Sequence, residues 1–265
     1  MKNEQVIEYI VGWLRDYAQT SGMTGFVVGV SGGIDSALTS TLCASTGLKT
    51  IVVELPIHQA ESQVNRAQRH MNELAIRFSN VEMCRVDLTP VFDTFMKAQV
   101  LQPLNEQTGM LTQANSRARL RMTTLYHIAG MRHCLVAGTG NKVEDFGVGF
   151  YTKYGDGGVD LSPIADLMKT EVFALARTIG VHDDILNAAP TDGLWGDDRT
   201  DEDQLGASYP ELEWAMLQHE RGMLTQENWT TRQHEVFAIF KRLHRANQHK
   251  MHPIPVCLIP KEIKG

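Results

Sequence analysis

A glycine-rich turn between an apolar run and a helical segment constrains the fold more than any other feature. Residues 26–30 (FVVGV) form a short apolar run, and residues 35–46 have helical spacing that ends at Gly47. Between them stands Ser-Gly-Gly-Ile-Asp-Ser, residues 31–36. A short apolar run bounded by turn residues is typical of a buried strand. The sequence therefore predicts a strand, a tight turn and a helix in immediate succession.

The same turn predicts an anion site. Gly32 and Gly33 allow close backbone approach and positive φ. The free amides of the following helix start, together with the hydroxyls of Ser31 and Ser36, can hold a phosphate. The turn lacks the lysine of a Walker P-loop and carries Asp35 instead. A carboxylate beside phosphates indicates a Mg²⁺ ligand. The alternative is a plain Gly-Gly turn in which Asp35 and Ser36 only cap the helix.

Strands and helices alternate along the chain. Such alternation predicts βαβ crossovers and an α/β fold, a doubly wound parallel sheet with helices on both faces. Loops that follow the strands then share one rim, where ligands of such sheets bind. No repeat or linker divides the chain, so we expect a single domain over residues 1–265. Helices are expected at 6–17, 35–46, 60–77 and 116–131 and further helices at 169–179 and 229–248; strands are expected at 26–30, 51–55, 81–86 and 134–137.

Composition excludes several classes of protein. The chain has 25 Lys and Arg against 31 Asp and Glu, a net charge of −6, which argues against a general binder of nucleic acid. No apolar run reaches membrane-spanning length, and the first residues lack the pattern of a secretory signal. The cysteines form no pair that suggests a disulfide or zinc site, so a cytoplasmic location with all of them buried is expected: Cys43, Cys84, Cys134 and Cys257.

A second motif adds candidate residues. The segment 154–158 is too rich in glycine for a strand or helix and predicts an exposed loop that orders over a ligand, unless it is an ordinary connection. Glu144 lies on the expected rim with Asp35, so the pair could share a Mg²⁺ ion, although alone Glu144 would be a surface charge. Lys169 opens an amphipathic helix and would neutralise phosphate charge if it lies near the turn; otherwise it is a solvated lysine.

These motifs carry a family resemblance. SGGIDS resembles the pyrophosphate-binding loop of the N-type ATP pyrophosphatases, enzymes of the adenine-nucleotide alpha-hydrolase fold type. Residues 138–160, GTGNKVEDFGVGFYTKYGDGGVD, with the following LSPIADLMKTEV, closely resemble the ammonia-dependent NAD synthetase family. The similarity runs from about residue 6 to 256 and includes four shorter segments, 115–122, 189–194, 201–206 and 248–250.

The resemblance implies a reaction. Deamido-NAD, ATP and ammonia would give NAD, AMP and pyrophosphate through an NAD-adenylate, the last step of NAD biosynthesis. The loop at 31–36 with Mg²⁺ would stabilise the departing pyrophosphate, and the loop at 146–158 would close as a lid. Two alternatives remain: another amide-forming N-type ATP pyrophosphatase, or a non-catalytic nucleotide-binding homologue.

The resemblance also assigns residues. ATP is expected at Gly29, Val30, Ser31, Gly32, Gly33, Ile34, Asp35, Ser36, Thr139, Lys169 and Thr191. Deamido-NAD is expected at Arg119, Lys153, Asp160, His249 and Lys250, with Arg117 and Arg121 facing a partner subunit or solvent. Mg²⁺ is expected at Asp35 and Glu144, and the catalytic candidates are Asp35, Lys169 and Asp156, the last as a candidate to take the ammonium proton.

Assembly and nitrogen source follow from the family as well. Members form homodimers with the dinucleotide site at the interface, to which the N-terminal helix and helix 116–131 would contribute. A glutaminase domain has no room in 265 residues that the synthetase already fills, so free ammonia is the expected nitrogen donor.

Two segments stand apart. Residues 192–203 carry six acids against one arginine, which predicts a solvated loop or, less simply, a segment that attracts ammonium. Between Glu144 and Phe150 the chain has one residue more than some family members.

Overall fold

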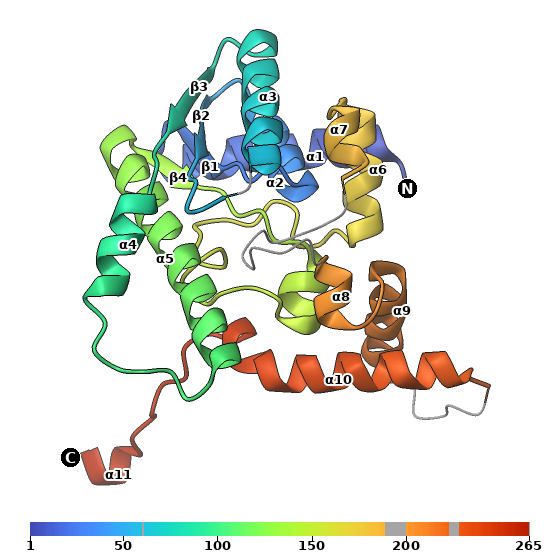
Figure 1. Ribbon diagram of the computed structural model, residues 1–265. Coiled ribbons are helices and arrows are strands. Elements are labelled where there is room, and N and C mark those ends of the chain that lie inside the picture. The colour runs from blue at the N-terminus through green and yellow to red at the C-terminus, as the bar shows by residue number, and fades with distance from the viewer. Residues whose placement is uncertain (60, 189–199, 223–227, 265) are drawn as a thin grey trace.

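A four-stranded parallel sheet with helices on both faces forms the centre of the computed structural model, which describes residues 1–59, 61–188, 200–222 and 228–264. The strand order is β3-β2-β1-β4 (Figure 1), so β2 and β3 lie on one side of β1 and β4 lies on the other. The strands are β1 (Gly25–Gly29), β2 (Lys49–Glu54), β3 (Val81–Arg85) and β4 (Cys134–Val136). The predicted α/β fold and all four strands are confirmed.

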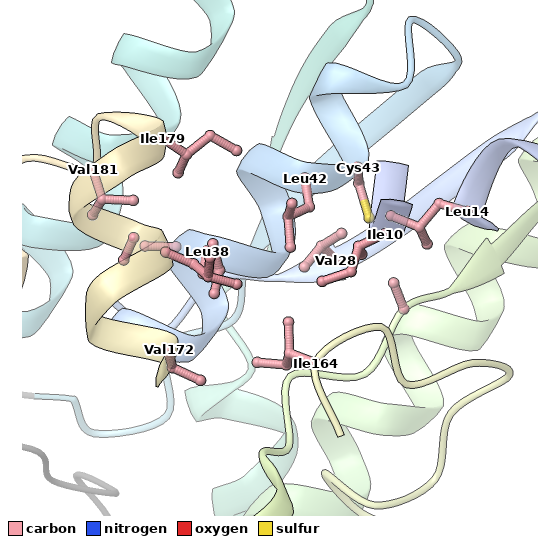
Figure 2. Close-up of a cluster of buried hydrophobic side chains, with 14 of the residues drawn as sticks. Ile10, Leu14, Val28, Leu38, Leu42, Cys43, Ile164, Val172, Ile179 and Val181 are labelled. Carbon is pink, nitrogen blue, oxygen red and sulfur yellow. The ribbon is translucent and has the colours of Figure 1, made fainter. Parts of the chain in front are cut away.

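Alternating side chains of β1 build the two faces of the core. Phe26 and Val28 pack on one face against α1 (Asn3–Thr20), α2 (Ile34–Ser45) and α6 (Lys169–Ile179), as Figure 2 shows for Val28 beside Leu38 and Leu42. Val27 faces the other side, toward α4 (Thr89–Lys97) and α5 (Glu106–Arg132). Burial on both faces explains why these strands are continuous apolar runs.

α3 (Glu61–Arg77) covers β2 on the α2 side, where Ala67, Met71 and Leu74 pack with Val52. A separate core lies beyond the carboxyl ends of the strands. It is built from a π-helix, η1 (Val143–Val148), from α9 (Tyr209–Glu220) and from α10 (Thr231–Met251), which lies along the bottom in Figure 1. Three short helices complete the described chain: α7 (Asp183–Leu186), α8 (Asp201–Leu205) and α11 (Lys261–Lys264).

Several elements differ from the prediction. α5 begins ten residues earlier than expected, at Glu106, because the Asn105 side chain caps it by accepting a hydrogen bond from the Thr108 amide at 2.9 Å. The sequence analysis expects no helix where the structure has α4, η1, α7, α8, α9 and α11. Cys43 and Cys134 are buried as expected, but Cys84 is partly exposed and Cys257 is exposed, because β3 is an edge strand and residue 257 lies on an exposed tail.

A π-helix occupies the segment in which the sequence analysis expects one extra residue. Hydrogen bonds in a π-helix span one residue more per turn than in an α-helix, and such turns gather at functional sites. η1 is six residues long and ends at Gly149, whose φ is +66°. This helical turn places Glu144 and Asp145 on the rim of the sheet.

Among the helices that the structure describes, we find none with the length and apolarity needed to cross a lipid bilayer.

Candidate active site

The loops at the carboxyl ends of β1, β2 and β4 surround a cavity of about 630 Å³. Residues 29–36, 53–56 and 136–140 line it, with α5 on one side and α3 on the other. This is the rim that the sequence predicted for ligand binding, and parallel strands place it there because their carboxyl ends share one edge.

The glycine-rich turn at residues 31–36 has the geometry of an anion-binding site. Gly32 has φ +83°, and a Cβ added there would lie 2.8 Å from the Gln63 carbonyl oxygen, so glycine is required. Gly33 has an ordinary φ of −92° and starts α2 without a side-chain cap, so of the two only Gly32 needs positive φ. Ser36 Oγ donates to the Gly33 carbonyl at 2.9 Å and accepts from the Ser31 amide at 3.2 Å, which closes the turn.

Lys169 joins the two carboxylates that the sequence proposed for Mg²⁺. Its ammonium, at the first turn of α6, donates to Asp35 Oδ2 at 2.6 Å and to Glu144 Oε1 at 2.9 Å. Lys169 is 2% exposed. The fold thus brings residues 35, 144 and 169 together from three separate elements, and the reading of Lys169 as a solvated lysine is excluded.

Electrostatics favours the charged forms of Lys169 and Glu144, whereas burial raises the pKa of Asp35. Burial alone would lower the pKa of Lys169, but the attraction of Asp35 and Glu144 outweighs it and raises the pKa. For Glu144, burial opposes ionisation, yet the Lys169 charge and a hydrogen bond from Tyr209 lower the pKa. Lys169 is therefore a cation and Glu144 a carboxylate at neutral pH, which suits a site for phosphates and a metal ion.

Three further residues of this network escaped the sequence analysis. Tyr209, at the start of α9, donates its hydroxyl proton to Glu144 Oε1 at 2.5 Å, and its ring lies 4.7 Å from the Lys169 ammonium. Asp201 is buried beside the same hydroxyl, which corrects the expectation of a solvated acidic loop at this position. Asn141 donates to Asp35 Oδ1 at 3.1 Å and accepts from the Glu144 amide. Asn141 and Asp201 lie within the segments 138–160 and 201–206 that carry the family resemblance, whereas no sequence signal pointed to Tyr209.

Comparisons with known proteins agree with this site. The family model described as NAD synthase matches residues 6–254. An NH(3)-dependent NAD(+) synthetase of Methanosarcina mazei is 36% identical over 260 residues, which cover 97% of this chain and 98% of the relative. The chain belongs to the NAD synthase family. This family catalyses the ATP-dependent amidation of deamido-NAD, the last step of NAD biosynthesis.

Solved structures of proteins named for two different activities have the same fold. NH3-dependent NAD synthetase from Campylobacter jejuni superposes with a TM-score of 0.78 at 25% identity, covering 97% of this chain and all of that one (100%). NMN synthetase from Francisella tularensis superposes with a TM-score of 0.82 at 29% identity, covering 98% of this chain and 99% of that one.

The proposed metal ligands fit Mg²⁺ in this NAD synthase fold. Asp35 Oδ2 and Glu144 Oε1 each lie within 2.9 Å of the same ammonium, so their carboxylates face one point. Mg²⁺ is commonly held by one or two carboxylates plus substrate phosphates. In the described part of the chain no cluster of three or more acidic, histidine or cysteine side chains is arranged to hold a metal ion.

Two arginines of α5, Arg119 and Arg121, have surroundings that differ from those expected. Arg121 is partly buried and lines the cavity, where it donates to the Leu55 carbonyl and to Gln59 Oε1, both at 2.9 Å, so it does not face solvent or a partner. Burial lowers the pKa of Arg121 to about 10. Arg119 is exposed and donates to the Lys153 carbonyl at 3.2 Å, so it lies beside the segment that precedes the loop 154–158 but is not among the residues that line the cavity.

Side chains of α10 form hydrogen bonds with the backbone between η1 and the loop 154–158. Lys250 donates to the carbonyls of Gly149 and Tyr151, each at 2.7 Å, and Asn247 donates to the Val148 carbonyl at 2.9 Å. Lys250 also lines the cavity. Its ammonium thus orders the backbone next to the expected dinucleotide.

The remaining predicted residues lie around the cavity or away from it. Thr139 and Asp156 line the cavity, and Asp156 Oδ1 accepts from the Thr152 amide at 3.0 Å. Asp160 instead accepts from the Val136 amide and the Tyr126 hydroxyl, at the end of β4. His249 is exposed, and its carbonyl accepts from Lys153 at 2.7 Å. Thr191, with the segment 189–194, lies outside the described residues.

Proposed function

We propose that this chain amidates the nicotinate carboxylate of deamido-NAD with ammonia and ATP, forming NAD, AMP and pyrophosphate. The observation that carries the proposal is the Lys169 ammonium held between Asp35 and Glu144 beside an anion-binding turn. That arrangement suits a nucleoside triphosphate whose α-phosphorus is attacked. The NAD synthase family then supplies the identity of the acyl group.

In the first step the nicotinate carboxylate attacks the α-phosphorus of ATP, and the bond to the pyrophosphate oxygen breaks. The amides at the start of α2 and the Ser31 and Ser36 hydroxyls bind the departing pyrophosphate. Lys169 offsets negative charge that develops on the phosphates. Mg²⁺, held by Asp35 and Glu144 when ATP is bound, would add Lewis-acid stabilisation of the same charge.

In the second step ammonia attacks the carbonyl carbon of the adenylate, and AMP leaves with the electron pair of the broken C–O bond. Asp156 lies in the same cavity, anchored to the Thr152 amide, and is our candidate to take the extra proton. The loop that contains it shields the adenylate, a mixed anhydride, from water. Arg119, Lys153, Asp160, His249 and Lys250 are proposed to bind or order deamido-NAD.

A direct assay tests the proposal. Purified protein with deamido-NAD, ATP, Mg²⁺ and ammonium should form NAD and pyrophosphate in equal amounts, whereas glutamine in place of ammonium should give little product. Asp35→Asn should abolish turnover and keep the fold. Absence of NAD with folded protein and intact substrates would reject the proposal. Mg²⁺ omission with added chelator should stop the reaction.

A second candidate substrate is nicotinate mononucleotide, which carries the same carboxylate without the AMP half. The match to NMN synthetase from Francisella tularensis, with a TM-score of 0.82, favours testing it. The two substrates should be compared by kcat/KM in the same assay. A higher value for the mononucleotide would reassign the substrate and leave the chemistry of the site unchanged.

For assembly and setting we propose a homodimer that acts on small molecules in the cytoplasm, as a single domain over residues 1–265 without a nucleic-acid partner. The dimer is supported by exposed apolar side chains where α4 connects to α5, among them Val100, Leu101 and Leu104. The acidic net charge of −6 supports the absence of nucleic acid.

A further inference from the structure

Glu54 lies in the wall of the reaction cavity with half of its carboxylate unpaired. It ends β2, is 3% exposed and lines the cavity. Its Oε2 forms an ion pair with Arg85 Nε at 3.0 Å and accepts a hydrogen bond from Gln68 Nε2 at 3.2 Å. Its Oε1 is buried and has no hydrogen-bond partner. Buried carboxylate oxygens are nearly always hydrogen-bonded, so Oε1 has the properties of an atom that awaits a ligand.

The position of Glu54 is next to the phosphate turn. Val53 pairs with Gly29 across the sheet, and the Val30 amide donates to the Val53 carbonyl at 2.8 Å, so Glu54 stands beside the residue that precedes Ser31. Arg66 of α3 lines the same wall, and its buried Nε also lacks a partner. The wall formed by β2 and α3 therefore presents an acceptor and a donor beside the turn.

The two substrates of the proposed reaction must bind to different sides of the cavity. The α5 wall and the glycine-rich loop carry the residues proposed for deamido-NAD, and the turn takes the phosphates. The wall of β2 and α3 is thus left for the nucleoside half of ATP. We infer that Glu54 recognises adenosine: its Oε1 accepts a hydrogen bond from a ribose hydroxyl or from the adenine amine. This inference rests on the proposed use of ATP.

Calorimetric binding without any acyl substrate tests the inference in wild-type protein. The ligands are the Mg²⁺ complexes of ATP and of three analogues that each lack one donor: 2′-deoxy-ATP, 3′-deoxy-ATP and purine riboside triphosphate, which has no amine. The analogue that lacks the recognised donor should bind about 10- to 100-fold more weakly, since a hydrogen bond to a charged group is lost. Equal affinity for all four ligands would overturn the inference.

Glu54→Gln sharpens the test because it keeps the shape. Arg85 and Gln68 would hold the amide oxygen of the introduced side chain, which turns its NH₂ group toward the place of Oε1 and replaces an acceptor with a donor. ATP should then bind as weakly as the discriminated analogue. Retained preference for ATP in a folded variant would contradict the role of Glu54.

The matched control is Glu82→Gln. Glu82 lies on the neighbouring strand and also pairs with an arginine, Arg132 at 2.9 Å, but its side chain is 45% exposed and does not line the cavity. Glu82→Gln should leave the affinities for ATP and its three analogues unchanged. If Glu54→Gln does not fold, the wild-type series decides alone. Failure to form NAD leaves this binding test intact, whereas failure to bind ATP overturns the inference and the proposed function together.

Discussion

At the residue scale, Lys169 is a buried cation that two carboxylates hold in the wall of the cavity. A lysine that is 2% exposed is tolerated only with paired charge, and here two carboxylates supply it. The same contact holds Asp35 and Glu144 at a common point before any ligand arrives. Tyr209 donates to the same Glu144 oxygen that accepts from Lys169, and so holds the second carboxylate in place.

Tyr209→Phe should weaken turnover without unfolding the protein. The change removes only the hydroxyl that donates to Glu144, and loss of a hydrogen bond to a charged group costs about 1.5–3 kcal/mol, or roughly a 10- to 100-fold fall in kcat/KM. Activity should also need more Mg²⁺ for half-saturation, because Glu144 is held less firmly. The control is Tyr17→Phe, at an exposed position on α1, which should match wild type. Unchanged Mg²⁺ dependence of Tyr209→Phe would contradict the positioning role.

At the element scale, a buried histidine links α2 to α3. His70 Nε2 lies 2.9 Å from Ser40 Oγ, and burial lowers the pKa of His70 to about 4. The unfolded chain takes up this proton near pH 6.5. Between these two values the unfolded state binds more protons, so folding stability falls as the pH falls.

The loss attributable to His70 should be about 2 kcal/mol between pH 7.5 and pH 5. His70→Leu removes the titrating group, and its unfolding free energy should therefore depend less on pH by that amount. Urea denaturation at the two pH values measures the difference. His127→Leu, at an exposed position of α5, serves as the control and should keep the wild-type slope. Equal slopes for His70→Leu and wild type would refute the prediction.

The junction of η1 with α10 also depends on a backbone conformation. Gly149 has φ +66°, and a Cβ there would lie 2.3 Å from Asn247 Cβ. Gly149→Ala should destabilise the protein by about 1–3 kcal/mol through strain and overpacking. It should also raise KM for deamido-NAD, since Lys250 holds this backbone.

Gly130→Ala provides the matched comparison for that substitution. Gly130 lies inside α5, and an added Cβ there meets nothing within 4 Å, so alanine should stabilise the helix by about 0.5–1 kcal/mol. Urea denaturation of both variants measures whether each substitution lowers or raises the free energy of unfolding. A destabilisation of equal size at both positions would show that the Asn247 contact is not responsible.

The sequence predicted strands better than helices, and the reason lies in burial. β1 and β2 are covered on both faces, so their apolar runs are unmistakable. The first third of α5 has few apolar residues and contains Gly109, and its helical state depends on the Asn105 cap and on packing. η1 could not be predicted because the same residues could form an α-helix; only packing against α9 and α10 selects the wider turn.

At the scale of the whole molecule, apolar surface is left uncovered near the start of α5. Leu101 and Leu104 are 88% and 93% exposed. Exposed apolar clusters of this kind mark interaction sites. The proposed homodimer would cover them beside the α5 wall of the cavity.

Sedimentation equilibrium should therefore give twice the chain mass of 29.6 kDa. The double substitution Leu101→Glu with Leu104→Glu should shift the protein to monomer and weaken deamido-NAD binding, because charges would be buried in the interface. Ile76→Glu is the control, since Ile76 is equally exposed, at 88%, on α3 away from α5. A wild-type monomer at all concentrations would exclude the dimer.

The sequence by itself determined the parallel sheet and the tight turn after β1, and it named Asp35, Glu144 and Lys169 as candidates for one site, because short motifs with local geometry carry that information. Only the tertiary structure decided that Lys169 bridges the two carboxylates and that Tyr209 and Asp201 join them. It also decided that Arg121 lines the cavity and does not face solvent. It alone exposed the unpaired oxygen of Glu54. Those facts depend on contacts between residues far apart in the chain, for which no local pattern exists.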